Sequence, residues 1–480
     1  MFTLQQANEY IKKHKSDVNL KYRLKYHMMP TVGWMNDPNG LIQYKGDYHL
    51  FYQYYPYDDV WGPMHWGHAT SKDLLKWTDQ EVALAPDQSY ESGCFSGGAI
   101  VKDDELYLMY TSHIEAADNG GVQKQTQSIA VSHDGKTFVK YANNPVIKET
   151  AIPEGASKAD FRDPNPFYRD GNYYVLVGSK TEQEIGQLLV YRSKDLINWE
   201  YLNKIGPHPM FGIMGECPDL FHLDGKDVIL MSSIQLKADD NKYRNVNSCI
   251  YIVGQFDSKT GSFDIEVIDE IDTGHDFYAP QTLEDEQGRR IMIGWMEMWG
   301  KEYLTHKLDH KWTGAMTLPR VLKLEGSQLI QQPISEVSKL RTKAQVFNNV
   351  ELNDEISIAF LMNKCSELVL KGRVEKEVML KFSQTEDDFF TIKINANQVT
   401  LDTMTSQLYP QEPRWVYSPV DTQEFDLRIY LDQSSIEIFA YEGKRLLTTR
   451  IYFEQEAYSL EVTGEQSTLD ILEYFELTLA

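Results

Sequence analysis

The chain has 480 residues, and its 71 acidic against 47 basic side chains leave a formal net charge of −24. A chain of this length exceeds what one hydrophobic core usually supports, so we expect two domains. The negative charge opposes nonspecific binding to nucleic acid and to anionic membranes, and we expect neither as a partner.

Residues 1–20 predict a short helix and a lead-in segment. Charged and amide side chains interrupt any apolar core of an export signal, and no later stretch approaches the length of a membrane span, so we expect a cytoplasmic protein. Apolar residues at nearly helical spacing predict a helix over residues 3–15, on the outside of the first domain: Phe2, Leu4, Ala7, Tyr10 and Ile11.

Residues 21–325 contain a repeat of about sixty residues, the length of a four-stranded sheet with its turns. Each repeat starts with a tight polar segment that runs into a Gly/Asp turn and an apolar strand. A fixed period of strands and turns predicts a β-propeller, here with five blades. The five segments are Asn36-Asp37-Pro38, Ser96-Gly97-Gly98, Arg162-Asp163-Pro164, Glu216-Cys217-Pro218 and Tyr278-Ala279-Pro280.

A second series of segments recurs with the same period. The segment Ser71–Trp77 reappears as Ser193–Trp199, and weaker versions start at Ser132 and Ser258. Short polar side chains that bond their own backbone would explain each segment alone, because such turns are common in β proteins. Two independent series with one period favour the propeller.

Equivalent positions on the blades of a propeller face one central axis. Asp37, Asp163 and Glu216 are therefore predicted to meet at one end of this domain, although they are far apart in the sequence. A carboxylate satisfied by its own turn is the alternative for any single Asp-Pro pair. Three carboxylates at equivalent positions favour a common site.

After the repeats, residues 326–344 predict a linker with a short helix, and residues 345–480 predict a second domain. Strands with alternating polarity follow one another there without the sixty-residue segment, for example Glu355–Phe360, Phe390–Ile394 and Leu427–Leu431. This pattern is typical of a β-sandwich. The predicted fold class is therefore all-β, a five-bladed propeller followed by a sandwich.

The candidate chemistry rests on the three carboxylates. The sequence shows no Gly-rich phosphate loop, no His/Cys cluster at metal spacing and no Gly-x-Ser-x-Gly turn, and its four cysteines are scattered. Two carboxyl groups that face each other across a sugar are the minimum equipment for glycoside hydrolysis. A third would bind ring hydroxyls, and neither a metal nor an organic cofactor is implied.

The neighbours of each acid in the sequence suggest different roles. Glu216 follows the apolar residues Phe211, Ile213 and Met214, a setting that suits a general acid near neutral pH. Amide groups near Asp37 and the charge of Arg162 beside Asp163 are expected to keep those two carboxyls ionised. Such a split is typical of an acid and nucleophile pair.

Aromatic and neutral polar side chains near the starts of the blades are candidates for sugar binding. A sugar's apolar face rests well on an aromatic ring. The alternative for several of these rings is ordinary core between blades, and for Trp66 we favour core. The aromatic candidates are Trp34, Trp61, Phe95, Tyr278 and Trp295, and the polar candidates are Asn36, Gln53 and Ser96.

These segments together resemble the signature motifs of glycoside hydrolase family 32, the invertase and sucrose-6-phosphate hydrolase family. The resemblance runs from about residue 26 to residue 443. The matching motifs are Trp34–Gly40, Tyr52–Pro56, Phe95–Gly97, Phe161–Pro164, Glu216–Asp219, Gly294–Met296 and Asp432–Phe439. We expect the last of these to pack on the propeller.

The resemblance implies a retaining β-fructofuranosidase. Asp37 would be the nucleophile that forms a fructosyl-enzyme, Glu216 the acid and later the base, and Asp163 the stabiliser of the transition state. The carboxyl groups of Asp37 and Glu216 would then lie about 5 to 5.5 Å apart. The residues that match the family's fructose pocket are Trp34, Asn36, Gln53, Trp61, Phe95, Ser96, Arg162 and Trp295.

The substrate stays open between sucrose, its 6-phosphate and short fructo-oligosaccharides. Gly215, directly before the acid, is expected to open space for the leaving group. Cations that would bind a phosphate, unless they are ordinary solvated surface, are Lys237, Lys242, Arg244, Lys301, Lys307 and Lys311. A fructosyltransferase and a noncatalytic carbohydrate-binding propeller remain as alternatives, and the oligomeric state is not predicted.

Overall fold

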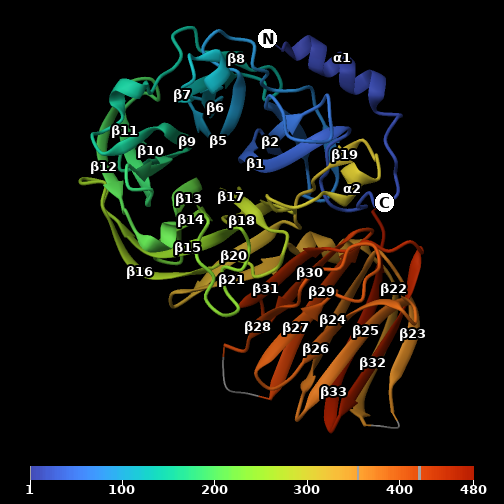
Figure 1. Ribbon diagram of the computed structural model, residues 1–480. Helices are drawn as coiled ribbons and strands as arrows, with labels where there is room; N and C mark the ends of the chain where they lie inside the picture. Colours follow the sequence, from blue (N-terminus) through green and yellow to red (C-terminus); the bar gives the residue numbers. More distant parts are fainter. Residues whose placement is uncertain (1, 354–355, 420–422, 480) are drawn as a thin grey trace.

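The computed structural model describes residues 2–353, 356–419 and 423–479. Its regular structure is almost entirely β, so the all-β prediction is confirmed. Figure 1 shows two groups of sheets: sheets of the first two thirds of the chain lie around a common centre, and the later strands stack beside them. No helix in the described ranges is both long and apolar enough to cross a lipid bilayer.

Five sheets follow one another along residues 33–333 (Figure 1). The first contains β1 (Gly33–Tyr44), β2 (Asp47–Tyr55), β3 (His65–Ser71) and β4 (Trp77–Asp79). The second contains β5 (Gly93–Lys102), β6 (Glu105–Ile114), β7 (Lys124–Ser132) and β8 (Val139–Lys140). The third contains β9 (Ala156–Arg169), β10 (Asn172–Thr181), β11 (Gly186–Ser193) and β12 (Trp199–Ile205).

The fourth sheet contains β13 (Met214–Leu223), β14 (Lys226–Ile234), β15 (Asn247–Phe256) and β16 (Phe263–Glu270). The fifth contains β17 (Tyr278–Glu284), β18 (Arg290–Trp295), β20 (Arg320–Glu325) and β21 (Gln328–Pro333). The first strands of the sheets touch in sequence, β1 with β5, β5 with β9, β9 with β13 and β13 with β17, and β17 returns to β1. The first strands therefore form a closed ring.

A segment that follows β18 in the chain adds a fifth strand to the first sheet. After the short helix α2 (Leu304–Lys307), strand β19 (Trp312–Thr313) pairs in parallel with the start of β1. Gly33 lies opposite Trp312 and Trp34 opposite Thr313. The chain thus returns to the sheet in which the ring began.

The repeated Ser-x-Asp segments form the same turn at two places. The amide of Leu74 donates to Ser71 Oγ at 2.9 Å, and the amide of Lys76 donates to Asp73 Oδ1 at 2.8 Å. Ser193 and Asp195 make the equivalent bonds between β11 and β12. Both segments therefore form turns that are held by their own side chains, and these turns recur because the four-stranded sheet is repeated.

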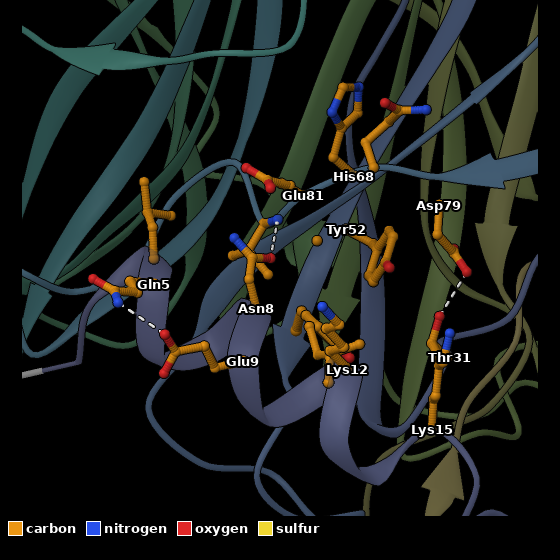
Figure 2. Close-up of a pocket in the computed structure, with 16 residues that line it drawn as sticks. Gln5, Asn8, Glu9, Lys12, Lys15, Thr31, Tyr52, His68, Asp79 and Glu81 are labelled. Carbon is orange, nitrogen blue, oxygen red and sulfur yellow. Dashed lines mark hydrogen bonds between the residues drawn. The ribbon is translucent and has the colours of Figure 1, made fainter.

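Helix α1 (Leu4–His14) matches the helix expected over residues 3–15 and packs on the first sheet. Its start is a capping box, in which the Gln6 amide donates to Thr3 Oγ1 and the Thr3 amide donates to Gln6 Oε1. Figure 2 shows the hollow of about 760 Å³ between this helix and strands β2 and β3. Three carboxylates line it, those of Glu9, Asp79 and Glu81, and none of them belongs to the three predicted to converge.

Two six-stranded sheets form the second group and share one hydrophobic core. In order across the first sheet the strands are β22 (Arg341–Leu352), β33 (Ser467–Leu477), β24 (Ser366–Arg373), β29 (Glu424–Asp432), β30 (Ser435–Ala440) and β31 (Arg445–Arg450). In the second they are β23 (Ile358–Asn363), β32 (Ala457–Glu465), β25 (Glu377–Thr385), β26 (Asp388–Ile394), β27 (Gln398–Asp402) and β28 (Arg414–Tyr417).

The segment expected as a linker over residues 326–344 holds regular strands at both ends. Strand β21 completes the fifth sheet up to Pro333, and β22 begins the next sheet at Arg341. The short stretch of chain between these two strands forms the 3₁₀ helix Ser335–Leu340. Its residues Val337 and Leu340 are buried. Polar residues interrupt the apolar pattern of β21, so the sequence pattern did not predict this strand.

A buried ionic network joins the two groups of sheets. Arg320 on β20 is fully buried, and its guanidinium donates to Asp272, to Glu437 Oε2 at 2.8 Å and to Thr448 Oγ1 at 2.7 Å. The Asp432–Phe439 segment therefore packs on the first group of sheets, as expected. Asp432 contributes too, since it accepts hydrogen bonds from the Lys25 and Tyr26 amides.

Substitution of Arg320 tests this network. Arg320→Ala would leave the carboxylates of Asp272 and Glu437 buried without their cation, so we expect a loss of roughly 3–5 kcal/mol in the free energy of unfolding. Denaturant unfolding measures it. The matched control is Arg192→Ala, which removes an exposed pair with Glu200 and should cost less than about 1 kcal/mol. Equal losses in the two variants would contradict the structural role of Arg320.

Candidate active site

Each of the five repeated segments interrupts the pairing of the first strand of its sheet. The register shifts fall between Met35 and Pro38, Phe95 and Gly97, Arg162 and Asn165, Glu216 and Asp219, and Tyr278 and Gln281. A β-bulge bends its strand and changes the direction of the side chains beside it. The repeat found in the sequence is therefore a repeated bulge at the inner edge of the sheets.

Three of the bulges hold a residue other than glycine in the left-handed region. Asp163 has φ +64°, Cys217 +47° and Ala279 +49°. Such conformations are strained for residues with a Cβ and persist only where the surroundings fix them. Hydrogen bonds between neighbouring sheets do so here: the Asp163 amide donates to Thr111 Oγ1 at 2.9 Å, and the Cys217 amide donates to Asp163 Oδ2 at 3.0 Å.

The side chain of Cys217 lies between two of the predicted carboxylates. Its Sγ is 3.6 Å from Asp37 Oδ2 and 3.5 Å from Asp163 Oδ2. Ser96 Oγ also donates to Asp37 Oδ2, at 2.6 Å, whereas Asp37 Oδ1 has no hydrogen-bond partner among the described residues. The first, third and fourth sheets thus bring their acids together, as the repeat predicted.

Burial changes the proton affinity of two of these acids. Loss of solvent raises the pKa of Asp37 to about 6, although the hydrogen bond from Ser96 opposes the rise. Loss of solvent and then the charge of Glu216 raise the pKa of Asp163 as well. Local amides and Arg162 were expected to keep both carboxyls ionised, and desolvation of the buried charge opposes that effect at each of them.

Arg162 binds Glu216 rather than Asp163. Its Nε and Nη2 atoms donate to Glu216 Oε1 at 2.9 and 2.8 Å, and Nη1 donates to Asp160 at 3.2 Å. The hydroxyl of Tyr278 donates to Glu216 Oε2 at 2.5 Å. The apolar setting expected for Glu216 from its sequence neighbours is therefore wrong, since both of its oxygens receive polar contacts from other sheets.

Nine of the twelve predicted site residues line one hollow of about 470 Å³. They are Asn36, Asp37, Gln53, Trp61, Phe95, Ser96, Arg162, Asp163 and Glu216. The other three, Trp34, Tyr278 and Trp295, are buried behind its wall. Trp34 Nε1 donates to Asn36 Oδ1 at 2.7 Å, so this ring orients a lining residue instead of facing the hollow.

Six residues that line the hollow were missed by the sequence analysis. They are His113, Glu115, Gln123, Gln125, Asp160 and Trp299. Asp160 stands three residues before Asp163. Gln125 lies in β7 and Gln123 directly precedes that strand, two residues away, so the sequence carried a signal for each of these positions. Trp299 packs against Trp295, with ring centroids 5.0 Å apart, and nothing in its local pattern separates it from core.

The two features expected to decide the leaving group do not face the hollow. A side chain at Gly215 would meet Met231 Sδ at 2.6 Å, so this glycine allows packing between strands and opens no space for a substrate. None of the six candidate phosphate-binding cations lines the hollow either. Lys301, for example, is paired with Asp276 and Glu297, and Arg244 is paired with Glu412.

Comparisons with known proteins agree with the motifs. Residues 27–333 match the family model "Glycosyl hydrolases family 32 N-terminal domain", and residues 335–476 match "Glycosyl hydrolases family 32 C terminal". A sucrose-6-phosphate hydrolase of Bacillus subtilis is 37% identical, with 90% of this chain and 89% of the relative covered. A raffinose invertase of Escherichia coli is 36% identical, with 91% of each covered.

A solved structure is similar over almost the whole chain. It is a mutant of a Bombyx mori β-fructofuranosidase of this family in complex with sucrose, with a TM-score of 0.87 and 36% identity, covering 99% of this chain and 98% of the other. The family models together span nearly the full sequence, and the bulges that carry the three acids lie within the first of them. The chain belongs to glycoside hydrolase family 32.

Proposed function

We propose that this protein is a retaining β-fructofuranosidase that hydrolyses sucrose or sucrose 6-phosphate and releases fructose. The observation that carries the proposal is the convergence of Asp37, Asp163 and Glu216 in a hollow of about 470 Å³. A sucrose-6-phosphate hydrolase, a raffinose invertase and a β-fructofuranosidase bound to sucrose are all similar to this chain, which supports the same substrate class here.

Asp37 is the nucleophile in this proposal. Its free Oδ1 attacks the anomeric carbon of the fructosyl unit while the bond from that carbon to the leaving oxygen breaks, and a covalent fructosyl ester forms. Ser96 and Cys217 donate to Oδ2 and leave the attacking oxygen unengaged by described residues. Their contacts support an orientation fixed before the substrate arrives.

Glu216 is the acid in the first step and the base in the second. It gives its proton to the leaving oxygen, then takes one from the water that attacks the fructosyl ester, so the carboxylate of Asp37 is restored. Arg162 and Tyr278 hold the two carboxyl oxygens and support this positioning. Asp163 accepts hydrogen bonds from fructose hydroxyls that strengthen as positive charge develops on the ring.

We also infer that the five sheets are the blades of a propeller and that the two six-stranded sheets form a sandwich. The closed ring of first strands and the return of β19 to β1 support five blades. On this basis the propeller domain extends to Pro333 and the sandwich starts near Arg341. The acids then occupy one end of the ring's axis, reached by a small neutral or phosphorylated sugar.

Asp37→Asn removes the proposed nucleophile without a change of shape. We expect kcat on sucrose to fall by about 10³-fold or more, because no fructosyl ester can form, whereas the unfolding temperature should stay close to that of the parent protein. Asp103→Asn, at an exposed carboxylate far from the hollow, is the matched control. Full activity in Asp37→Asn would show that Asp37 is not the nucleophile.

Glu216→Gln should discriminate between leaving groups. Loss of the acid matters most when the leaving oxygen needs a proton, so the rate on sucrose should fall much further than the rate on a fructoside of an acidic phenol. The ratio of kcat/KM for the two substrates measures the effect. An equal loss on both substrates would indicate that Glu216 is not the proton donor.

The acidity of Asp37 predicts the pH dependence of the reaction. The nucleophile must be ionised, and its pKa is raised to about 6, so kcat/KM should decline as the pH falls through about 6. Ser96→Ala removes a hydrogen bond that stabilises the carboxylate, so the decline should begin at a higher pH. Ser258→Ala, on an exposed turn, serves as control, and an unshifted profile in Ser96→Ala would argue against Asp37 as the titrating group.

A further inference from the structure

The hollow beneath helix α1 lies apart from the three carboxylates of the candidate active site (Figure 2). Its volume of about 760 Å³ is within the range of small-molecule sites, roughly 300–1,000 Å³. Tyr52 and Tyr54 of β2 line it, whereas Gln53 between them lines the carboxylate hollow. Because successive side chains of a strand point to opposite faces, the two hollows lie on opposite faces of the first sheet.

A glycine in β3 brings the hydroxyl of Tyr52 to this hollow. Gly67 pairs with Tyr52 across the two strands, and a Cβ at Gly67 would lie 2.2 Å from the Tyr52 ring. The ring therefore crosses β3, and its hydroxyl reaches the floor of the hollow. Tyr52 is only 3% exposed, and its hydroxyl makes no hydrogen bond to any residue that the structure describes. A polar group in such a place is open to bond with a bound molecule.

The walls of the hollow offer both donors and acceptors. Asn8 Oδ1 accepts from the Val82 amide at 3.0 Å, which fixes this lining side chain and leaves its Nδ2 group as a donor. Thr31 Oγ1 donates to Asp79 Oδ2 at 2.6 Å, which leaves Asp79 Oδ1 as an acceptor. A hydroxyl group both donates and accepts, so a lining of this mixed kind suits a molecule that carries many hydroxyls.

The charges around the hollow nearly balance. Glu9, Asp79 and Glu81 lie opposite Lys12 and Lys15, and within the described ranges neither lysine forms an ion pair. A ligand with a large net charge of either sign would meet like charges on one of the walls. A neutral molecule with many hydroxyls meets no such opposition, and its apolar faces can rest on the ring of Tyr52.

We propose that the hollow between α1, β2 and β3 is a second, noncatalytic binding site, for a neutral sugar of one or two units. The sugar's hydroxyls bond to Tyr52, Asp79 and Asn8, and helix α1 closes the site from outside. The inference goes beyond the proposed hydrolase function and does not depend on it, because the two hollows share no lining residue.

Methyl NMR spectroscopy of the full chain tests this site. Ile11 and Val82 line the hollow, so their methyl signals respond to a ligand there, and Ile11→Val identifies the Ile11 signal by its loss. Glucose is the probe, because it has no glycosidic bond to hydrolyse. We expect the Ile11 signal to shift with added glucose and to level off below about 50 mM. Ile392, in the core of the second group of sheets, is the reference and should not move.

Two variants of lining residues should weaken the response by different amounts. Glu81→Trp places a large ring in the hollow and should abolish the shift of the Ile11 signal. Tyr52→Phe removes one hydrogen bond and should raise the Kd for glucose about three- to tenfold. The matched control is Glu375→Trp, at an exposed carboxylate between β24 and β25, and it should respond like the parent protein.

Three results would overturn the proposal. The first is an Ile11 signal that stays in place, or one that moves in proportion to glucose without levelling off. The second is a shift that survives in Glu81→Trp. The third is saturation by glucose 6-phosphate at a lower concentration than by glucose, since the two lysines would then select an anion. Hydrolysis of sucrose by the same protein tests the proposed function separately.

Discussion

The gathering of three carboxyl side chains around one hollow, two of them buried, is the constraint on which the rest of the site depends. Asp37 and Asp163 are each less than one tenth exposed, and carboxylates so close together and so far from water resist ionisation. The protein offsets this cost with one guanidinium, from Arg162, and with donors from Ser96, Cys217 and Tyr278. These donors come from four different sheets, and Asp37 comes from the remaining one, so the site exists only when the ring is closed.

The repeated bulge explains how five sheets can direct side chains toward one site. A regular strand would send successive side chains to opposite faces, whereas a bulge at the same place in each first strand turns the chosen side chain toward the shared space. The strained φ of Asp163 and Cys217 is kept by hydrogen bonds that cross between sheets. Strain and assembly are thus linked, because the second sheet supplies the bond that fixes Asp163 and the third sheet supplies the bond that fixes Cys217.

The second group of sheets supplies none of the described residues that line the carboxylate hollow, and buried charges hold it against the first group. Arg320 and His27 are held by carboxylates of β29 and β30, and burial alone would lower the pKa of His27, but its hydrogen bonds to Asp432 and Glu437 raise it to about 8. The imidazole is therefore largely protonated at neutral pH and pairs with both acids. A buried, charged network of this kind fixes the contact between the two groups in one position.

The sequence by itself determined which residues carry the chemistry and that they recur with one period. Asp37, Asp163 and Glu216, their aromatic neighbours and helix α1 could all be read locally, because bulges, turns and helix caps depend on residues a few positions apart. Only the tertiary structure decided what surrounds each acid. Arg162 stands next to Asp163 in the chain but binds Glu216, and Gly215 packs against Met231, because those partners come from neighbouring strands and sheets. Desolvation, which sets the acidity of Asp37, is likewise a property of the closed ring and not of any segment.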